Sequence, residues 1–191
     1  MNRYQPLLER QREFFFTDAT KSLAWRREQL DRMERMLREN QDAFCQALYR
    51  DFHKPPFEQQ FEITVPLGVI RYYREHLAEL MAPQPVAIPA GLEATGNRGV
   101  IHKEPYGVTL VIGPFNAPVL LLLDPAIAAL AAGNTVVLKP ANTTPTVAAL
   151  FQRLVPRYFP AEAVSVVTGG REEIGALLEL PFDFIFFTGS S

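Results

Sequence analysis

The sequence predicts an α/β protein in which amino-terminal helices precede a parallel, Rossmann-like doubly wound sheet. Three observations support this prediction. Up to about residue 81, apolar residues recur at helical spacing among arginine, glutamate and glutamine. Residues 82–105 are then rich in proline and glycine, which indicates a connector. From residue 106 onward, short apolar runs alternate with helical stretches, the order typical of a parallel sheet covered by helices on both faces.

The composition excludes several classes of protein. The 191 residues are 48% hydrophobic and 21% charged, which is typical of a globular chain. A net charge of −2 lacks the basic excess of a nucleic-acid binder. The longest apolar stretch, Val119 to Ala132, is broken by Asp124–Pro125 and is shorter than the roughly 20 residues of a membrane helix. With no secretory signal and one cysteine, we expect a cytoplasmic protein without membrane or nucleic-acid partners.

The segment 1–81 is expected to contain several helices. Asn40 can end a first helical run, and Asp42 can cap a second helix that ends near Phe52. The two prolines after Lys54 predict a turn, because proline disfavours helix at the preceding residue. A third helix is predicted over Phe57–Met81, with Pro66 either kinking or splitting it.

Two features of these helices could have been functional. The dense arginine and glutamate face from Arg26 to Glu39 could bind a partner, but a solvated face with weak ion pairs is the favoured interpretation. Cys45 lies in the amphipathic helical region with no motif around it, so we interpret it as a semi-buried structural thiol.

The carboxy-terminal half supplies the predicted sheet. A short strand over Val100–Lys103 belongs to the connector, and four further strands are predicted over Gly107–Ile112, Thr135–Leu138, Val164–Val167 and Phe182–Phe187. Gly133 is expected to close the first intervening helix, and Thr144 to be the N-cap of the second, with Pro145 in its first turn. A short helix over Glu172–Glu179 precedes the last strand.

Polar or glycine-bearing residues follow the predicted strands, at the edge where open α/β sheets bind ligands. After the first strand, Gly113 allows a close approach to the backbone, Pro114 stiffens the turn and Asn116 offers a side-chain amide. Asn116 could instead cap the next helix, with Pro118 in its first turn, and its position alone slightly favours the cap.

Lys139 leaves the second strand, where it could reach the hydroxyls or phosphates of a nucleotide. An ordinary exposed strand-end lysine is the alternative. Gly189–Ser190 ends the last strand and is typical of the start of a loop that leads into an anion-binding helix amino-terminus.

Three motifs taken together resemble the aldehyde dehydrogenase superfamily. They are EPYGVTLVIGPFNAP (104–118), AAGNTVVLKP (131–140) and FDFIFFTGS (182–190). The lead-in over Leu23–Arg50, followed by RDFHKPPFEQQFEI, resembles the branch that contains class 3, benzaldehyde and coniferyl aldehyde dehydrogenases. The resemblance implies a truncated aldehyde dehydrogenase fold with three segments: 1–81 helical, 82–105 a Pro/Gly-rich connector and strand, and 106–191 an incomplete dinucleotide-binding domain.

The resemblance implies NAD or NADP as cofactor and assigns roles to particular residues. Lys139 would bind the adenosine ribose, with Asn142 at the position that selects between the two cofactors. Gly169 would lie near the adenine, and Asn116 would be the oxyanion-hole amide. The rest of the implied cofactor cleft comprises Ile112, Gly113, Pro114, Phe115, Thr188, Gly189 and Ser190. No metal ligand is implied.

The chemistry implied by the resemblance is oxidation of an aldehyde to a carboxylic acid through a cysteine thiohemiacetal, with a glutamate activating water. Neither the cysteine motif nor the glutamate segment is present in these 191 residues, and Cys45 has no motif that would let it substitute. We therefore expect no turnover by this chain alone. The complete enzyme is expected to bind an aldehyde and to form a homodimer. A non-catalytic nucleotide-binding or interaction protein on the same scaffold is the alternative, and a related acyl-phosphate or acyl-CoA reductase is a third.

Several residues depart from the family pattern. Ala117 follows the asparagine where an aromatic residue is usual, and Asp124 replaces a small or neutral residue, although Asp–Pro also predicts a helix start. Asn142 replaces a glutamate that favours NAD by repelling a 2′-phosphate. This replacement predicts dual or NADP-leaning cofactor use.

Overall fold

A computed structural model of the chain describes residues 2–190, so the outermost residues of the predicted segments, Met1 and Ser191, lie outside it. Its helices are α1 (Gln5–Phe15), α2 (Leu23–Glu39), α3 (Gln41–Phe52), α4 (Pro56–Met81), α5 (Ala90–Glu93), α6 (Leu120–Ala132), α7 (Pro145–Tyr158) and α8 (Arg171–Leu178), with a 3-10 turn at Ala19–Lys21. Its strands are β1 (Gln84–Val86), β2 (Gly99–Ile101), β3 (Val108–Ile112), β4 (Thr135–Lys139), β5 (Val164–Val166) and β6 (Phe184–Phe187).

The predicted α/β class is confirmed. Four parallel strands form one sheet in the order β5-β4-β3-β6. The chain moves from β3 outward to β4 and β5, and then returns to the other side of β3 for β6. The direction of winding therefore reverses between β3 and β6, which is the topological switch point where open α/β sheets bind ligands.

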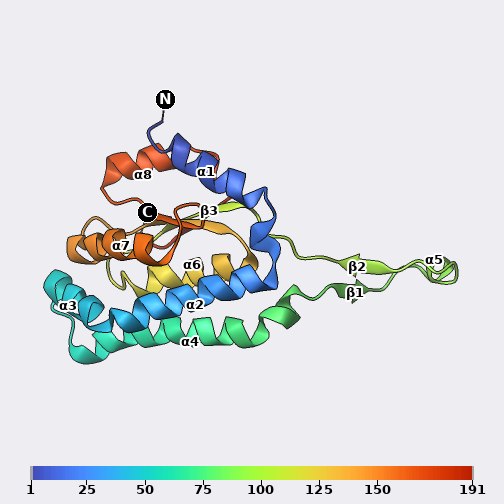
Figure 1. Cartoon of the computed structure of the whole chain (residues 1–191), viewed down its shortest axis with the longest axis horizontal. Helices are drawn as coiled ribbons and strands as arrows, with labels where there is room; N and C mark the ends of the chain where they lie inside the picture. Colours follow the sequence, from blue (N-terminus) through green and yellow to red (C-terminus); the bar gives the residue numbers. More distant parts are fainter. Residues whose placement is uncertain (1, 191) are drawn as a thin grey trace.

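Helices cover both faces of this sheet (Figure 1). On one face, α6 and α7 pack with α2, α3 and α4 in the larger core, which includes Val111, Val136 and Leu138 from the strands. On the other face, Leu8 of α1 and Leu177 of α8 pack against alternate strand residues. Because β3 and β4 are buried on both faces, their residues form continuous apolar runs.

The amino-terminal helices differ from expectation in three respects. Asp42 does not cap α3, because the helix begins at Gln41 and the position before it is Asn40. Pro66 does not split α4, which is one continuous helix of 26 residues with Pro66 inside it. The charged face of α2 is solvated and carries i,i+4 ion pairs such as Arg32–Glu28, but Arg26 is buried and donates to the carbonyl of Ala131 at the end of α6.

The connector forms an arm that projects from the body (Figure 1). β1 and β2 pair antiparallel, and α5 lies at the far end of the arm. The strand predicted over Val100–Lys103 is β2, whereas β1 was not predicted. Exposed apolar side chains along this arm are those of Val86, Leu92, Val100 and Ile101. Within residues 2–190, no helix is both long and apolar enough to cross a membrane.

Candidate functional site

The candidate site lies at the carboxyl edge of the parallel sheet, where β3, β4, β5 and β6 all end. Two backbone hydrogen bonds hold these strand ends together beyond the strands themselves. The N–H of Gly113 donates to the carbonyl of Lys139 at 3.1 Å, and the N–H of Thr188 donates to the carbonyl of Ile112 at 3.0 Å. The predicted residues Ile112, Gly113, Lys139 and Thr188 are thereby adjacent, as the parallel topology requires.

The loop after β3 is partly buried and partly open. Gly113 and Pro114 are buried, and a Cβ on Gly113 would lie only 3.0 Å from the side chain of Leu122 on α6. Phe115 points outward, with its ring stacked on that of Phe52 at 6.2 Å between centroids. Asn116 is exposed, and within residues 2–190 its side chain forms no hydrogen bond to another protein group.

Asn116 therefore does not cap α6, and the prediction that it is a helix cap is wrong. A residue of α4 has that role instead. The Oε2 atom of Glu62 accepts the N–H of Val119 at 2.9 Å and the N–H of Leu120 at 3.3 Å. Glu62 is buried, and its other oxygen lies 2.8 Å from Nζ of Lys54. Asp124 is likewise not at the helix start, because α6 begins four residues earlier, at Leu120.

The next helix, α7, is capped in the same way. Thr144 stands at the N-cap position as predicted, but its hydroxyl donates to the Ala141 carbonyl and caps nothing. The carboxylate of Asp51 on α3 accepts the N–H groups of Thr146 and Val147 at 3.1 and 2.9 Å. Two carboxylates from the amino-terminal helices thus occupy the positive ends of α6 and α7.

Lys139 is buried, which corrects the interpretation of it as an ordinary exposed lysine. Its Nζ donates to the carbonyls of Pro140 at 2.8 Å and Gly169 at 2.7 Å, so it joins the ends of β4 and β5. Burial lowers the pKa of the Lys139 ammonium, and the nearby negative charge of Glu173 partly offsets this effect. An ammonium has three donors, and these two carbonyls use two of them.

Asn142 and the glycine pair after β5 lie close to Lys139. Gly169 has a φ of +125°, a conformation that favours glycine. A Cβ on Gly170 would meet only the Nδ2 atom of Asn142, at 3.7 Å. The exposed amide of Asn142, the buried amine of Lys139 and the backbone of Gly170 therefore lie in one small region of the sheet edge.

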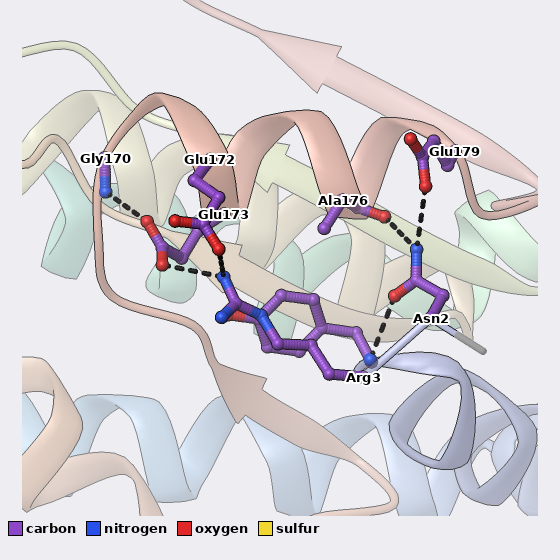
Figure 2. A network of polar contacts seen from close by, with 8 residues as sticks. Asn2, Arg3, Gly170, Glu172, Glu173, Ala176 and Glu179 are labelled. Atoms are coloured by element: carbon purple, nitrogen blue, oxygen red, sulfur yellow. Dashed lines mark hydrogen bonds and ion pairs between the residues drawn. The ribbon is translucent and has the colours of Figure 1, made fainter.

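A polar network holds the start of α8 beside this region (Figure 2). Glu173 accepts the N–H of Gly170 at 2.7 Å, and Arg3 lies 2.7 Å from the other oxygen of Glu173. Backbone N–H groups of Glu173 and Gly170 lower the pKa of the Glu173 carboxyl, and the charge of Arg3 adds to the effect. Asn2 donates to the carbonyl of Ala176, which fastens the amino-terminus to the same helix.

The three crossover helices of the sheet thus share one property: a carboxylate of this chain occupies each amino-terminus. Glu62 does so for α6, Asp51 for α7 and Glu173 for α8. Helix amino-termini are the usual anion sites of such sheets. In this protein, carboxylates of the chain itself already occupy these three. The end of β6, with Thr188 half-buried and Gly189 and Ser190 exposed, has no such carboxylate among the described residues.

Sequence reasoning missed all three carboxylates. Glu173 had a weak local signal, since a glutamate three residues after an N-cap position is half of a capping box. Glu62 and Asp51 had none, because their partners lie 57 and 95 residues further along the chain. Cys45 is half-buried on α3, and burial raises the pKa of its thiol, as is usual for a structural cysteine.

The sheet and its site define a doubly wound α/β protein whose ligand edge lies at the β3/β6 switch point. Comparison with known sequences gives the family: residues 9–191 match the profile of the Aldehyde dehydrogenase family. The chain belongs to that family.

Individual relatives agree. The chain is 40% identical over 178 residues to 4,4'-diaponeurosporen-aldehyde dehydrogenase of Staphylococcus aureus, covering 93% of this chain and 38% of that protein. It is 39% identical to human aldehyde dehydrogenase family 3 member B1, covering 96% of this chain and 39% of that protein. The predicted likeness to class 3 enzymes is confirmed. The chain spans about two fifths of the length of these curated relatives.

A solved structure gives the same result for the fold. The substrate-bound state of Staphylococcus aureus AldH superposes with a TM-score of 0.95 at 37% identity, covering 100% of this chain and 41% of that one. The α/β fold with its parallel sheet is therefore that of an aldehyde dehydrogenase, represented here by a partial domain.

Proposed function

We propose that this chain is the NAD(P)-binding portion of an enzyme that oxidises an aldehyde to a carboxylic acid through a cysteine thiohemiacetal. The observation that carries the proposal is the occupancy of the helix amino-termini. Since carboxylates close the ends of α6, α7 and α8, an anionic pyrophosphate is repelled there and is accommodated after β6, at Thr188, Gly189 and Ser190.

The residues present fit a dinucleotide. Lys139 has an unused donor for the hydroxyls of the adenosine ribose, and Asn142 offers an uncharged amide beside it. Gly170, whose Cβ position would meet only Asn142, leaves room for the adenine, while Gly169 packs against Glu173. Ile112 to Phe115 follow β3 at the same sheet edge and are assigned to the wall of the cleft. Bound in this cleft, the cofactor supplies a hydride acceptor.

Asn116 serves the aldehyde. Its exposed amide can donate to the carbonyl oxygen as negative charge develops on it, because no other described group competes for that donor. Glu62 supports this role because its carboxylate holds the first N–H groups of α6 in place. The loop that carries Asn116 leads directly into this fixed helix start. The thiol and the water-activating carboxylate belong to parts of the family fold that these 191 residues do not span.

The complete enzyme is proposed to be a homodimer. The arm formed by β1, α5 and β2 projects away from the body and exposes apolar side chains, which favours contact with a second subunit. Sedimentation of the complete enzyme with Ile101→Lys on the arm tests this, and a monomeric variant supports it.

The decisive experiment for the function compares two proteins. A complete enzyme carrying this chain should reduce NAD or NADP in the presence of benzaldehyde or hexanal, while the 191-residue chain alone should not. Lys139→Met in the complete enzyme should raise the KM for the cofactor more than it lowers kcat. Binding of NAD(P) without aldehyde oxidation by the complete protein would instead favour a non-catalytic binding protein.

A further inference from the structure

One carboxylate near the site has no role in the chemistry above. Asp124 lies on the inner side of α6, and its Oδ1 atom is buried with no hydrogen-bond donor among the described residues. Burial raises the pKa of the Asp124 carboxyl. A buried oxygen without a donor is unfavourable, so its presence requires an explanation.

Asp124 faces a cavity of about 600 Å³ between α4, α6 and the end of β6. The cavity wall includes the aromatic rings of Tyr72, Tyr73 and Phe186 and the apolar side chain of Leu121. Pro125, also in the wall, has no N–H and cannot donate to the Leu121 carbonyl four residues earlier.

The cavity adjoins the candidate site at Thr188. Thr188 lines it, and the backbone of Thr188 bonds to Ile112 at the base of the loop that carries Asn116. Leu121 lines it as well, and its N–H donates to the carbonyl of Ala117, the residue after Asn116. Asn116 itself does not line the cavity, so a molecule whose reacting carbon lies at Asn116 reaches Asp124 by extending along the first turns of α6.

The geometry points to an aldehyde that carries a protonated amine on its tail as the occupant of this cavity. This inference rests on the proposed function and names its substrate class. A carboxylate with a free oxygen pairs strongly with an ammonium group, and none of the residues 2–190 that line the cavity is a lysine or arginine that would compete. The aromatic rings of Tyr72 and Tyr73 also attract a cation. A substrate with a neutral hydroxyl in place of the ammonium would not gain from this attraction.

The test uses a complete enzyme carrying this chain and matched pairs of aldehydes, 3-aminopropanal with butanal and 6-aminohexanal with heptanal. In at least one pair, the amino aldehyde is expected to have the higher kcat/KM by about tenfold or more. Asp124→Leu should lower kcat/KM for the amino aldehyde and raise it for the alkanal, so the preference inverts. Asp42→Asn, which removes an exposed carboxylate from α3, is the control of equal charge and should keep the preference.

Inhibition separates a cation from a neutral donor. Hexylammonium should compete with the aldehyde more strongly than hexanol does, and Asp124→Asn should abolish that difference. Equal inhibition by the two, or an unchanged preference in Asp124→Leu, overturns the inference. If alkanals are oxidised but no amino aldehyde is preferred, only this inference fails. If no aldehyde is oxidised with either cofactor, the proposed function fails as well.

Discussion

Glu62 and Val119 are 57 residues apart in the chain, yet the carboxylate of the first accepts the backbone N–H of the second at 2.9 Å. This contact joins the amino-terminal helices to the start of the helix that follows Asn116. It also supplies a buried negative charge at a positive helix end, where such a charge is stabilising.

Glu62→Ala is expected to lower the free energy of unfolding of the chain by about 2–3 kcal/mol, because two N–H groups lose their acceptor and Lys54 loses the nearer of its two carboxylate partners. Urea unfolding followed by circular dichroism measures this. Glu58→Ala removes an exposed carboxylate that also pairs with Lys54, and should cost no more than about 1 kcal/mol. Equal losses in the two variants would mean that Glu62 is not a cap of any consequence.

Asn116→Ala is expected to reduce kcat of the complete enzyme by about 10²–10³-fold, the usual cost of losing an oxyanion donor. The free energy of unfolding should stay unchanged, because the amide makes no hydrogen bond within residues 2–190. Stopped-flow kinetics and urea unfolding on the same preparations distinguish the two effects. A large loss of stability with unchanged kcat would restore the helix-cap interpretation.

Asn142→Glu is expected to shift cofactor preference toward NAD. A carboxylate at this exposed position, close to Gly170, would repel a 2′-phosphate and lower kcat/KM for NADP by about tenfold. The measured quantity is the ratio of kcat/KM for NADP to that for NAD. Strict NAD dependence of the unmodified complete enzyme would show that residue 142 does not govern the choice.

Asp124→Asn is expected to stabilise the chain at neutral pH. Burial raises the pKa of Asp124, so the folded state binds the proton more tightly than the unfolded state. The free energy of unfolding therefore falls as the pH rises above 3.8, the ordinary pKa of an aspartate. The asparagine variant has no carboxyl group to ionise and does not lose this stability. Unfolding at a series of pH values should show the gain at pH 7 and its disappearance below that ordinary value. A gain that is constant with pH would exclude charge burial as its cause.

The sequence predicted the strands and helices of the sheet well, because buried parallel strands such as β4 form continuous apolar runs. It missed β1, where Pro85 weakens the strand pattern and the pairing partner lies beyond a long connection. It left the start of α6 open between Asn116–Pro118 and Asp124–Pro125, and the helix begins between them, at Leu120. The Asp124–Pro125 pair is typical of a helix start, but packing of Leu122 and Leu123 in the core extends the helix toward Asn116.

The candidate site was predictable only where a residue follows its own strand. Lys139, Gly169 and Thr188 could be placed at the sheet edge from strand order alone. The burial of Lys139 and the carboxylates of Glu62 and Asp51 could not, because they depend on contacts between distant segments that no local pattern encodes.

Leu8 on α1 and Leu177 on α8 belong to one cluster, although they stand near opposite ends of the chain. During synthesis, the ribosome makes Leu8 long before Leu177. The apolar side of α1 therefore stays exposed until α8 has been made. Contacts of such long sequence separation slow folding, because the intervening chain must be ordered first. One face of the sheet is therefore finished late, and a chaperone that shields α1 in the interval should raise the yield of folded protein.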